Sequence, residues 1–264
     1  MVLHNGTILL CGGGGNSQQC LQLDHGLWKQ HSTFNEERIK HSAVNTKTAT
    51  FLFGGRHGGY DSNEHVFGGW LSNGKTFEYL PKDSTTWLMG KTEIPKCFWS
   101  GCAISVKSDK EIWLIGGWRT EKRILSFNVK DHTFQELPTQ LNAERMAHRC
   151  AFIPNTKRIM ITGGSNYPDG SLNSTEIIDT EDGSVTIASP MNSKRAYHGM
   201  GIFTIDGGQR LAAFGGSDGY NELDSIELYN TITGKWDTTN MKLKEAKIFF
   251  GFLSVKLADV ISHL

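Results

Sequence analysis

Short apolar runs, each followed by a pair of glycines, recur along the chain. The runs are continuous rather than alternating, which is typical of a strand buried on both faces. They occupy residues 8–10, 51–53, 112–115, 159–161 and 211–214. The glycine pairs that follow are Gly12 and Gly13, Gly54 and Gly55, Gly116 and Gly117, Gly163 and Gly164, and Gly215 and Gly216. Their spacing is close to the period of about 40 to 50 residues found in blade and solenoid architectures.

Residues 210–247 show the repeated pattern most clearly. An apolar strand ends at the glycine pair, a polar loop follows, and residues 225–229 form a second strand. A turn-rich segment at 230–234 then leads into a third strand, which Trp236 opens. We expect these strands to form one small antiparallel sheet, and the chain repeats this sheet five times.

Two further sequence features repeat along the chain with the same period as the glycine pairs. A glutamate precedes a Trp or Val by nine residues at Glu78 and Trp87, Glu227 and Trp236, and Glu176 and Val185. An Arg-x-x-His motif occurs at Arg38 and His41, Arg145 and His148, and Arg195 and His198. The two other copies place Lys96 and Trp99, and Lys247 and Phe250, at these positions. We expect the arginines to satisfy loop carbonyls and the histidines to pack at the start of a strand.

A glycine pair at the end of a strand, with a Trp or other aromatic about twenty residues later, resembles the kelch repeat. The aromatic positions are Trp28, Trp87, Phe134 and Trp236, with Val185 in the fourth copy. The resemblance covers nearly the whole chain. It implies an all-β fold, a kelch-type β-propeller with five recognisable four-stranded blades whose strands are named a to d. The repeats then span about residues 1–40, 41–95, 96–144, 145–194 and 195–246, with a closing strand at 247–256.

The two ends of the chain suggest how such a propeller closes. Residues 1–4 align with the end of a strand a, and residues 248–256 read as a strand a with nothing after it. Either the C-terminal strand completes the first blade of a five-bladed propeller, or an upstream blade is missing and the chain is a truncated six-bladed propeller. We favour the truncated form, because most kelch propellers have six or more blades.

The second copy contains a long insertion, residues 56–74, between its strands b and c. Loops longer than about 12 residues are often functional. The kelch resemblance implies a binding face made of the b–c and d–a loops. Its residues would be Arg56, His57, Tyr60, Asp61, His65, Trp70, Trp118, Arg119, Lys122, Asn166, Tyr167, Asp169, Asp218, Tyr220 and Asn221. Trp, Tyr and Arg are enriched at binding hot spots, although Trp118, Tyr167 and Tyr220 could instead pack against the next blade.

The balance of charge restricts the class of partner. The chain has 27 basic and 27 acidic residues. Nucleic acids and anionic membranes select for net positive charge, so we expect neither as a partner. No apolar run approaches the roughly 20 residues that would span a bilayer, so we expect no membrane insertion.

The cysteines and glycosylation motifs bear on the compartment. Cys11 and Cys20 lie on neighbouring strands of one hairpin and could form a disulfide. Cys102 and Cys150 align at equivalent positions of strand a, and we expect them to be small core residues. Asn5 and Asn173 begin N-x-Ser/Thr sequons, Asn5-Gly6-Thr7 at a turn and Asn173-Ser174-Thr175 in a loop. Together these features favour a secreted protein over a cytoplasmic one.

No residue pattern indicates catalysis. The cysteine, tyrosine and histidine arrangement of galactose oxidase is not found, and His57, Asp61 and His65 are better explained by a polar loop than by a metal site. We therefore expect no catalytic residue, no metal ion and no cofactor. The predicted function is a non-enzymatic binding or scaffold module for a protein or peptide partner. The alternatives are a glycan-binding propeller or a sugar-modifying enzyme of the sialate mutarotase or galactose oxidase type.

Overall fold

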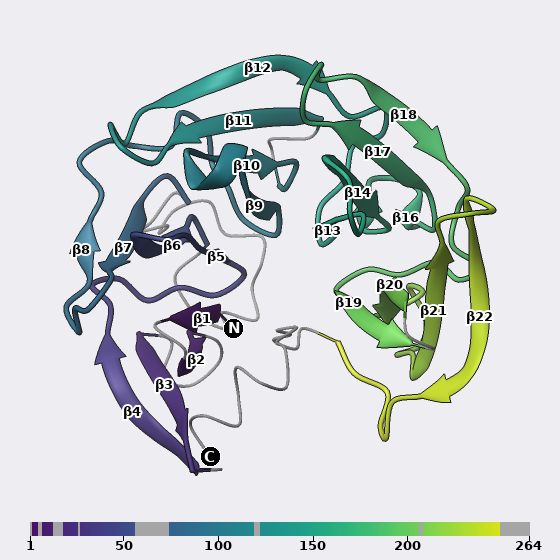
Figure 1. The fold of residues 1–264 in the computed structure, drawn as a ribbon, viewed down its shortest axis with the longest axis horizontal. Coiled ribbons are helices and arrows are strands. Elements are labelled where there is room, and N and C mark those ends of the chain that lie inside the picture. Colours follow the sequence, from purple (N-terminus) through teal and green to yellow (C-terminus); the bar gives the residue numbers. More distant parts are fainter. Residues whose placement is uncertain are drawn as a thin grey trace.

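Five antiparallel sheets of four strands each are arranged in a ring in the described part of the chain (Figure 1). The structure is a computed structural model, and it describes residues 2–4, 7–12, 18–25, 27–55, 74–118, 122–205 and 208–248. The expected all-β propeller with five four-stranded blades is confirmed. Within these residues, no helix is long and apolar enough to cross a membrane.

Each blade is built in chain order from an inner strand a to an outer strand d (Figure 1). Blade 1 consists of β1 (Val2–His4), β2 (Thr7–Cys11), β3 (Gln19–Asp24) and β4 (Leu27–Thr33). Blade 2 consists of β5 (Ser42–Asn45), β6 (Ala49–Phe53), β7 (Phe77–Pro81) and β8 (Leu88–Met89). Blade 3 consists of β9 (Cys102–Val106), β10 (Glu111–Ile115), β11 (Arg123–Asn128) and β12 (Phe134–Gln140), with a 3-10 turn η1 (Lys107–Asp109) after β9.

The last two blades follow the same order. Blade 4 consists of β13 (Arg149–Phe152), β14 (Arg158–Thr162), β17 (Thr175–Asp179) and β18 (Val185–Ala188). Its b–c loop contains a small hairpin of β15 (Ser165–Asn166) and β16 (Gly170–Ser171). Blade 5 consists of β19 (Gly199–Ile205), β20 (Gly208–Phe214), β21 (Ser225–Asn230) and β22 (Lys235–Lys242). Strand a of blade 1 is β1, and most of the expected closing strand, residues 249–256, lies outside the described residues.

The hydrophobic core lies between the faces of neighbouring blades. Between blades 2 and 3, the rings of Phe53, Phe77 and Phe127 are all within 5.6 Å of one another, measured between centroids. All three side chains are fully buried, and each such burial stabilises the fold by about 1.5 to 3 kcal/mol. Because each b strand packs against a blade on either side, its residues are continuously apolar, as the sequence pattern predicts.

Two disulfides connect strands of the ring. Cys11 and Cys20 are bonded, face each other on β2 and β3, and have Cα atoms 4.1 Å apart. Cys102 and Cys150 are also bonded, with Cα atoms 6.0 Å apart, and they join β9 of blade 3 to β13 of blade 4. The expectation that this second pair would be equivalent core residues is wrong. Cys102 pairs with the last residue of its b strand and Cys150 with the last but one, and this offset of one residue lets the two sulfur atoms meet across the blade interface.

Candidate functional site

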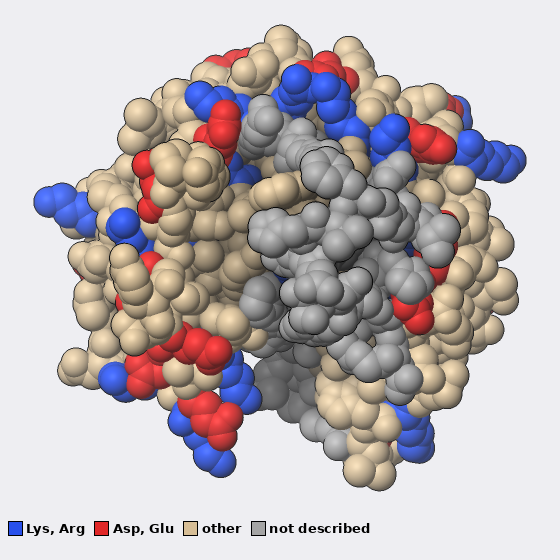
Figure 2. Space-filling model, turned by 180° about the vertical axis from the view of Figure 1, so that it is seen from behind, with Lys and Arg blue, Asp and Glu red and all other residues tan. Residues whose placement is uncertain are grey.

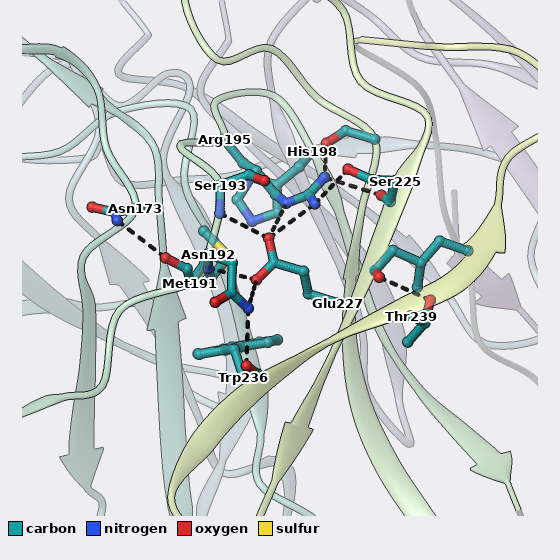
Figure 3. Close-up of polar contacts among 12 residues, drawn as sticks. Asn173, Met191, Asn192, Ser193, Arg195, His198, Ser225, Glu227, Trp236 and Thr239 are labelled. Atoms are coloured by element: carbon teal, nitrogen blue, oxygen red, sulfur yellow. Dashed lines mark hydrogen bonds and ion pairs between the residues drawn. The ribbon is translucent and has the colours of Figure 1, made fainter.

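A buried ion pair joins the linker before blade 5 to strand c of that blade (Figure 3). Arg195, on the linker between β18 and β19, donates to Glu227 Oε1 on β21 at 3.0 Å and to the Gly215 carbonyl oxygen at 2.9 Å. Asn192 and Ser193 donate their backbone N–H groups to the same carboxylate, at 2.6 and 3.0 Å. Both charged side chains are buried. Because Glu227 is saturated by protein donors, this pair holds the blade together and has no capacity for a ligand.

The same pair recurs in blades 4 and 2. Arg145 lies 2.7 Å from Glu176, and Arg38 lies 3.1 Å from Glu78. The Nη1 atoms of Arg145 and Arg38 each donate to the carbonyl oxygen of the first glycine of a pair, at 2.7 Å in both blades. These contacts agree with the expected role of the arginines, whereas the glutamate partner was not foreseen. The sequence did contain a signal for this partner, because the glutamate recurs with the same period as the arginine.

Blade 3 replaces the whole ion pair with apolar residues. The Phe98 carbonyl oxygen accepts the backbone N–H of a glycine of the preceding blade, Gly55. The carbonyl oxygens of Arg145 and Arg195, in the linkers into blades 4 and 5, accept a glycine N–H in the same way. Leu125 occupies the cross-strand position of the glutamates, and Pro95, which has no N–H, stands where asparagine donates to them. The alignment of Lys96 and Trp99 with Arg and His is therefore wrong by two residues. Phe98 stands eleven residues after Trp87, as Arg145 does after Phe134, whereas Lys96 stands only nine residues after Trp87.

The histidines of the motif are packing groups. The side chains of His148 and His198 are fully buried, and His198 Nε2 lies 2.8 Å from Thr162 Oγ1 on strand b. Burial lowers the pKa of His41 and of His148 to about 3 and lowers that of His198 well below its usual value. All three rings are therefore neutral near pH 7.

Three successive backbone hydrogen bonds join four residues of the d–a linkers in an open chain. Ser100 donates its N–H to the Lys40 carbonyl at 2.9 Å, Ala147 donates to Ser100 at 2.6 Å, and Tyr197 donates to Ala147 at 2.9 Å. Each residue has a left-handed backbone, with φ between 54° and 57°. We call Lys40, Ser100, Ala147 and Tyr197 the axial ring. It links the d–a linkers that lead into blades 2 to 5.

The axial ring brings side chains from distant blades together. Lys40 Nζ lies 5.4 Å from the ring centroid of Trp99 and 5.8 Å from that of Tyr197. Lys40 precedes blade 2 and Tyr197 precedes blade 5, so these contacts reach across the axis. Trp99 in turn stacks on Trp118, with 5.1 Å between centroids and 27° between ring planes.

The b–c loops and the d–a linkers lie on one face. Ser165, at the start of the blade 4 loop, exchanges backbone hydrogen bonds of 2.8 and 2.9 Å with Met146 of a linker. Ser217 of blade 5 does the same with Ala196. These bridges fasten the loops to the linkers that carry the axial ring.

Two tyrosines project from these fastened loops. Tyr167, at the tip of the β15–β16 hairpin, is 93% exposed, and Tyr220 of blade 5 is 97% exposed. The Asp218 carboxylate accepts the N–H groups of Tyr220 and Asn221, at 2.8 and 2.7 Å. Neither tyrosine packs against the next blade, which was the alternative explanation for them. The 40% exposed Trp118 stacks on Trp99, which belongs to the linker into its own blade.

Residues 208–239, which form β20, β21 and the first part of β22, match the model of the Kelch motif. The chain is a kelch-type β-propeller. A solved structure titled "Structure of YjhT" is similar in fold to this kelch propeller, with a TM-score of 0.73 and 13% sequence identity over 94% of this chain and 84% of that one. That likeness carries the fold alone. A search of curated proteins finds no significant match.

Several residues of the expected binding face fall outside the described part of the kelch propeller. They are Arg56, His57, Tyr60, Asp61, His65, Trp70 and Arg119, and Asn5 and Gly13 also lie there. Among the residues that the structure describes, no three His, Cys, Asp or Glu side chains are grouped as metal ligands. The Lys122 side chain is half-buried, and Asn166 donates to Asp169 at 3.1 Å. The amide of Asn173, a predicted glycosylation site, donates to the Met191 carbonyl at 3.0 Å.

The residues of the axial ring were missed by sequence reasoning. Lys40 and Tyr197 stand between the Arg and the His of the repeated motif, and only the motif itself was interpreted. Basic and acidic side chains are interspersed around the rim of the face seen in Figure 2, in keeping with the zero net charge of the kelch propeller.

Proposed function

We propose that this kelch propeller is a non-enzymatic binding module that recognises a protein or peptide through the b–c loops and d–a linkers of blades 3 to 5. The observation that carries the proposal is the exposure of Tyr167 and Tyr220, at 93% and 97%, on the same face. A tyrosine supplies a large contact area with little side-chain entropy to lose. Two such rings, left in water by the free protein, suit a partner that covers them.

The backbone beneath these rings is already ordered. The β15–β16 hairpin pairs Ser165 with Ser171 and is fastened to a linker at Met146. The blade 5 loop is held by Asp218 and by the Leu223 N–H, which donates to the Gly216 carbonyl at 2.7 Å. A pre-ordered loop loses less conformational entropy when it binds a partner, so these loops are suited to recognition.

The test compares capture of cross-linked partners by three forms of the chain. The loop variant combines Tyr167→Ala and Tyr220→Ala. The control is Ile232→Ala, which removes a 95% exposed side chain from the β21–β22 turn at the opposite end of the blade. Truncating two hot-spot residues should weaken binding by at least about tenfold.

We expect the wild type and the Ile232→Ala control to capture the same partner and the loop variant to lose it, with all three melting at the same temperature. Equal capture by the loop variant would show that the partner does not bind through the two tyrosines of this face. If glycosidase treatment of the partner abolishes its capture, the propeller binds a glycan rather than a peptide.

A further inference from the structure

The bond between Cys102 and Cys150 crosses from one blade to the next, unlike the bond between Cys11 and Cys20. Cys102 lies on β9 and Cys150 on β13, and these strands belong to different sheets. Cys11 and Cys20 lie on β2 and β3, which are paired within one sheet. Loss of the first bond therefore removes a connection between blades 3 and 4, whereas loss of the second leaves a hydrogen-bonded hairpin.

The two bonds also differ in their access to water. Cys102 and Cys150 are both half-buried, whereas Cys11 and Cys20 are only 7% and 0% exposed. A reductant must reach a sulfur atom before thiol–disulfide exchange can begin, and exposed disulfides are the labile ones. The bond between the blades is therefore the one that a reductant reaches first.

The repeat does not require a disulfide at this place. The position of Cys102, opposite the last residue of strand b, is held by Ser42 in blade 2. The Ser42 hydroxyl donates to the Gly101 carbonyl oxygen at 2.8 Å, so a hydrogen bond joins blades 2 and 3 there. The core between blades 3 and 4 is formed by other side chains, among them the fully buried Ile115 and Ile161. We therefore expect the ring to stay folded when the bond is open.

The segment before Cys150 is the linker that fastens the β15–β16 hairpin. Met146 exchanges backbone hydrogen bonds of 2.8 and 2.9 Å with Ser165, the first residue of that hairpin. Its neighbour Ala147 donates its N–H to the Ser100 carbonyl oxygen at 2.6 Å. Ser100 and Ala147 stand two and three residues before the bonded cysteines. The disulfide thus acts together with backbone hydrogen bonds to hold this linker against blade 3.

We propose that the Cys102–Cys150 bond is a reducible latch that determines how firmly blade 4 holds the hairpin carrying Tyr167. With the bond closed, the linker is covalently tied to blade 3. With the bond open, backbone hydrogen bonds alone resist local opening of the linker, and the hairpin fastened to the linker opens with it. As a control of binding, the latch rests on the proposed function, because Tyr167 is one of the two tyrosines that would contact the partner.

Opening the latch takes two electrons from a dithiol. A thiolate of the dithiol attacks one sulfur of the bond, which gives a mixed disulfide and releases the other cysteine as a thiolate. The second thiol of the reagent then displaces the first cysteine and closes a disulfide within the reagent. The two cysteines take up the two protons that the dithiol loses, so the products are two cysteine thiols and one oxidised dithiol.

The first test treats the native wild-type chain with increasing concentrations of dithiothreitol. Cysteines that become reactive are alkylated, and mass spectrometry of the peptides identifies them. We expect Cys102 and Cys150 to become reactive at concentrations that leave Cys11 and Cys20 bonded. The proposal is overturned if the hairpin bond opens first or at the same concentration, or if opening the bond between the blades unfolds the chain.

Two double variants distinguish the latch from the general effect of losing a disulfide. The open variant combines Cys102→Ser and Cys150→Ser, and the control variant combines Cys11→Ser and Cys20→Ser. Both should melt roughly 5 to 15 °C below the wild type, because each lacks one cross-link. The reduced wild type provides the same comparison without any substitution.

Hydrogen exchange then measures the effect on the hairpin. We expect the amides of Ala147 and Ser165 to exchange faster in the open variant and in the reduced wild type than in the oxidised wild type. The matching bridge of blade 5, between Ala196 and Ser217, is the control within the same molecule and should exchange at an unchanged rate. The control variant should leave both bridges unchanged. Equal exchange at Ala147 and Ser165 in the open and closed forms would show that the bond is not a latch.

Capture of the cross-linked partner connects the latch to binding. The open variant should capture less partner than the wild type, because a loosened hairpin loses more conformational entropy on binding. Equal capture would show that the bond does not control binding. If the Tyr167→Ala and Tyr220→Ala variant captures as the wild type does, the proposed function fails, whereas the reduction and exchange measurements still decide whether the bond is a latch.

Discussion

At the residue scale, the most informative comparison is between blades 2, 4 and 5, which contain the buried Arg–Glu pair, and blade 3, which does not. Arg195 and Glu227 are each almost completely inaccessible to solvent, at 0% and 1%. Blade 3 holds Phe98 and Leu125 at the same places and forms the same sheet. A buried ion pair and a well-packed apolar pair can therefore serve the same purpose, provided that both members change together.

Removing one member of the pair should be far more harmful than removing both. Arg195→Met leaves Glu227 charged and buried, so we expect the free energy of unfolding to fall by about 3 to 5 kcal/mol. Adding Glu227→Leu should restore part of this loss, limited by the Asn192 N–H that then lacks an acceptor. Urea titration measures both effects.

Arg210→Met provides the matched control, because Arg210 forms an exposed pair with Asp237 at 3.7 Å. We expect this substitution to change the free energy of unfolding by only about 0 to 1 kcal/mol. If the double variant were no more stable than Arg195→Met alone, the comparison with blade 3 would be invalid.

At the element scale, the glycine pairs decide how closely a linker can approach the end of strand b. Gly164 has φ of +94°, and a Cβ added there would lie 2.5 Å from the Met146 carbonyl oxygen. The hairpin glycine Gly170 has a similar φ of +73°, but an added Cβ would meet nothing within 4 Å. Substitution of Gly170 therefore tests the cost of a left-handed backbone alone, whereas substitution of Gly164 tests that cost together with the cost of a close contact.

Replacing each glycine with alanine should reveal this difference. Gly170→Ala should cost about 1 to 2 kcal/mol, the penalty for a left-handed backbone alone. Gly164→Ala should cost about 3 kcal/mol or more, because a linker must also move away. Thermal unfolding of the two variants checks the order, and equal losses would show that the approach of the linker is unimportant.

At the scale of the whole molecule, the repeated histidines make the stability of the ring depend on pH. His41, His148 and His198 have folded-state pKa values below the ordinary value of 6.5, near 3 for the first two. Below pH 6.5 the unfolded chain therefore binds protons that the folded chain does not. Stability is unaffected by these groups above that pH and decreases as the pH falls from about 6.5 toward 3.

Each histidine should contribute a slope of about 1.4 kcal/mol per pH unit within this window. His148→Gln should therefore reduce the acid dependence of the free energy of unfolding between pH 6 and 4 by about that amount. An unaltered slope in His148→Gln would mean that this ring is protonated in the folded protein.

The order of strands and the five blades could be predicted from the sequence, because each blade is a local unit. Apolar runs, glycine pairs and turns are features of neighbouring residues, and neighbouring residues form the hairpins of one sheet. The disulfide between Cys11 and Cys20 was foreseen for the same reason, since the two residues lie on one hairpin.

What joins one blade to the next was decided by the tertiary structure alone. The Cys102–Cys150 bond connects residues 48 positions apart in blades 3 and 4, and the axial ring joins linkers that are similarly far apart in the sequence. Such contacts depend on how strands from separate blades are offset when they pack, and a shift of one residue changes which side chains meet.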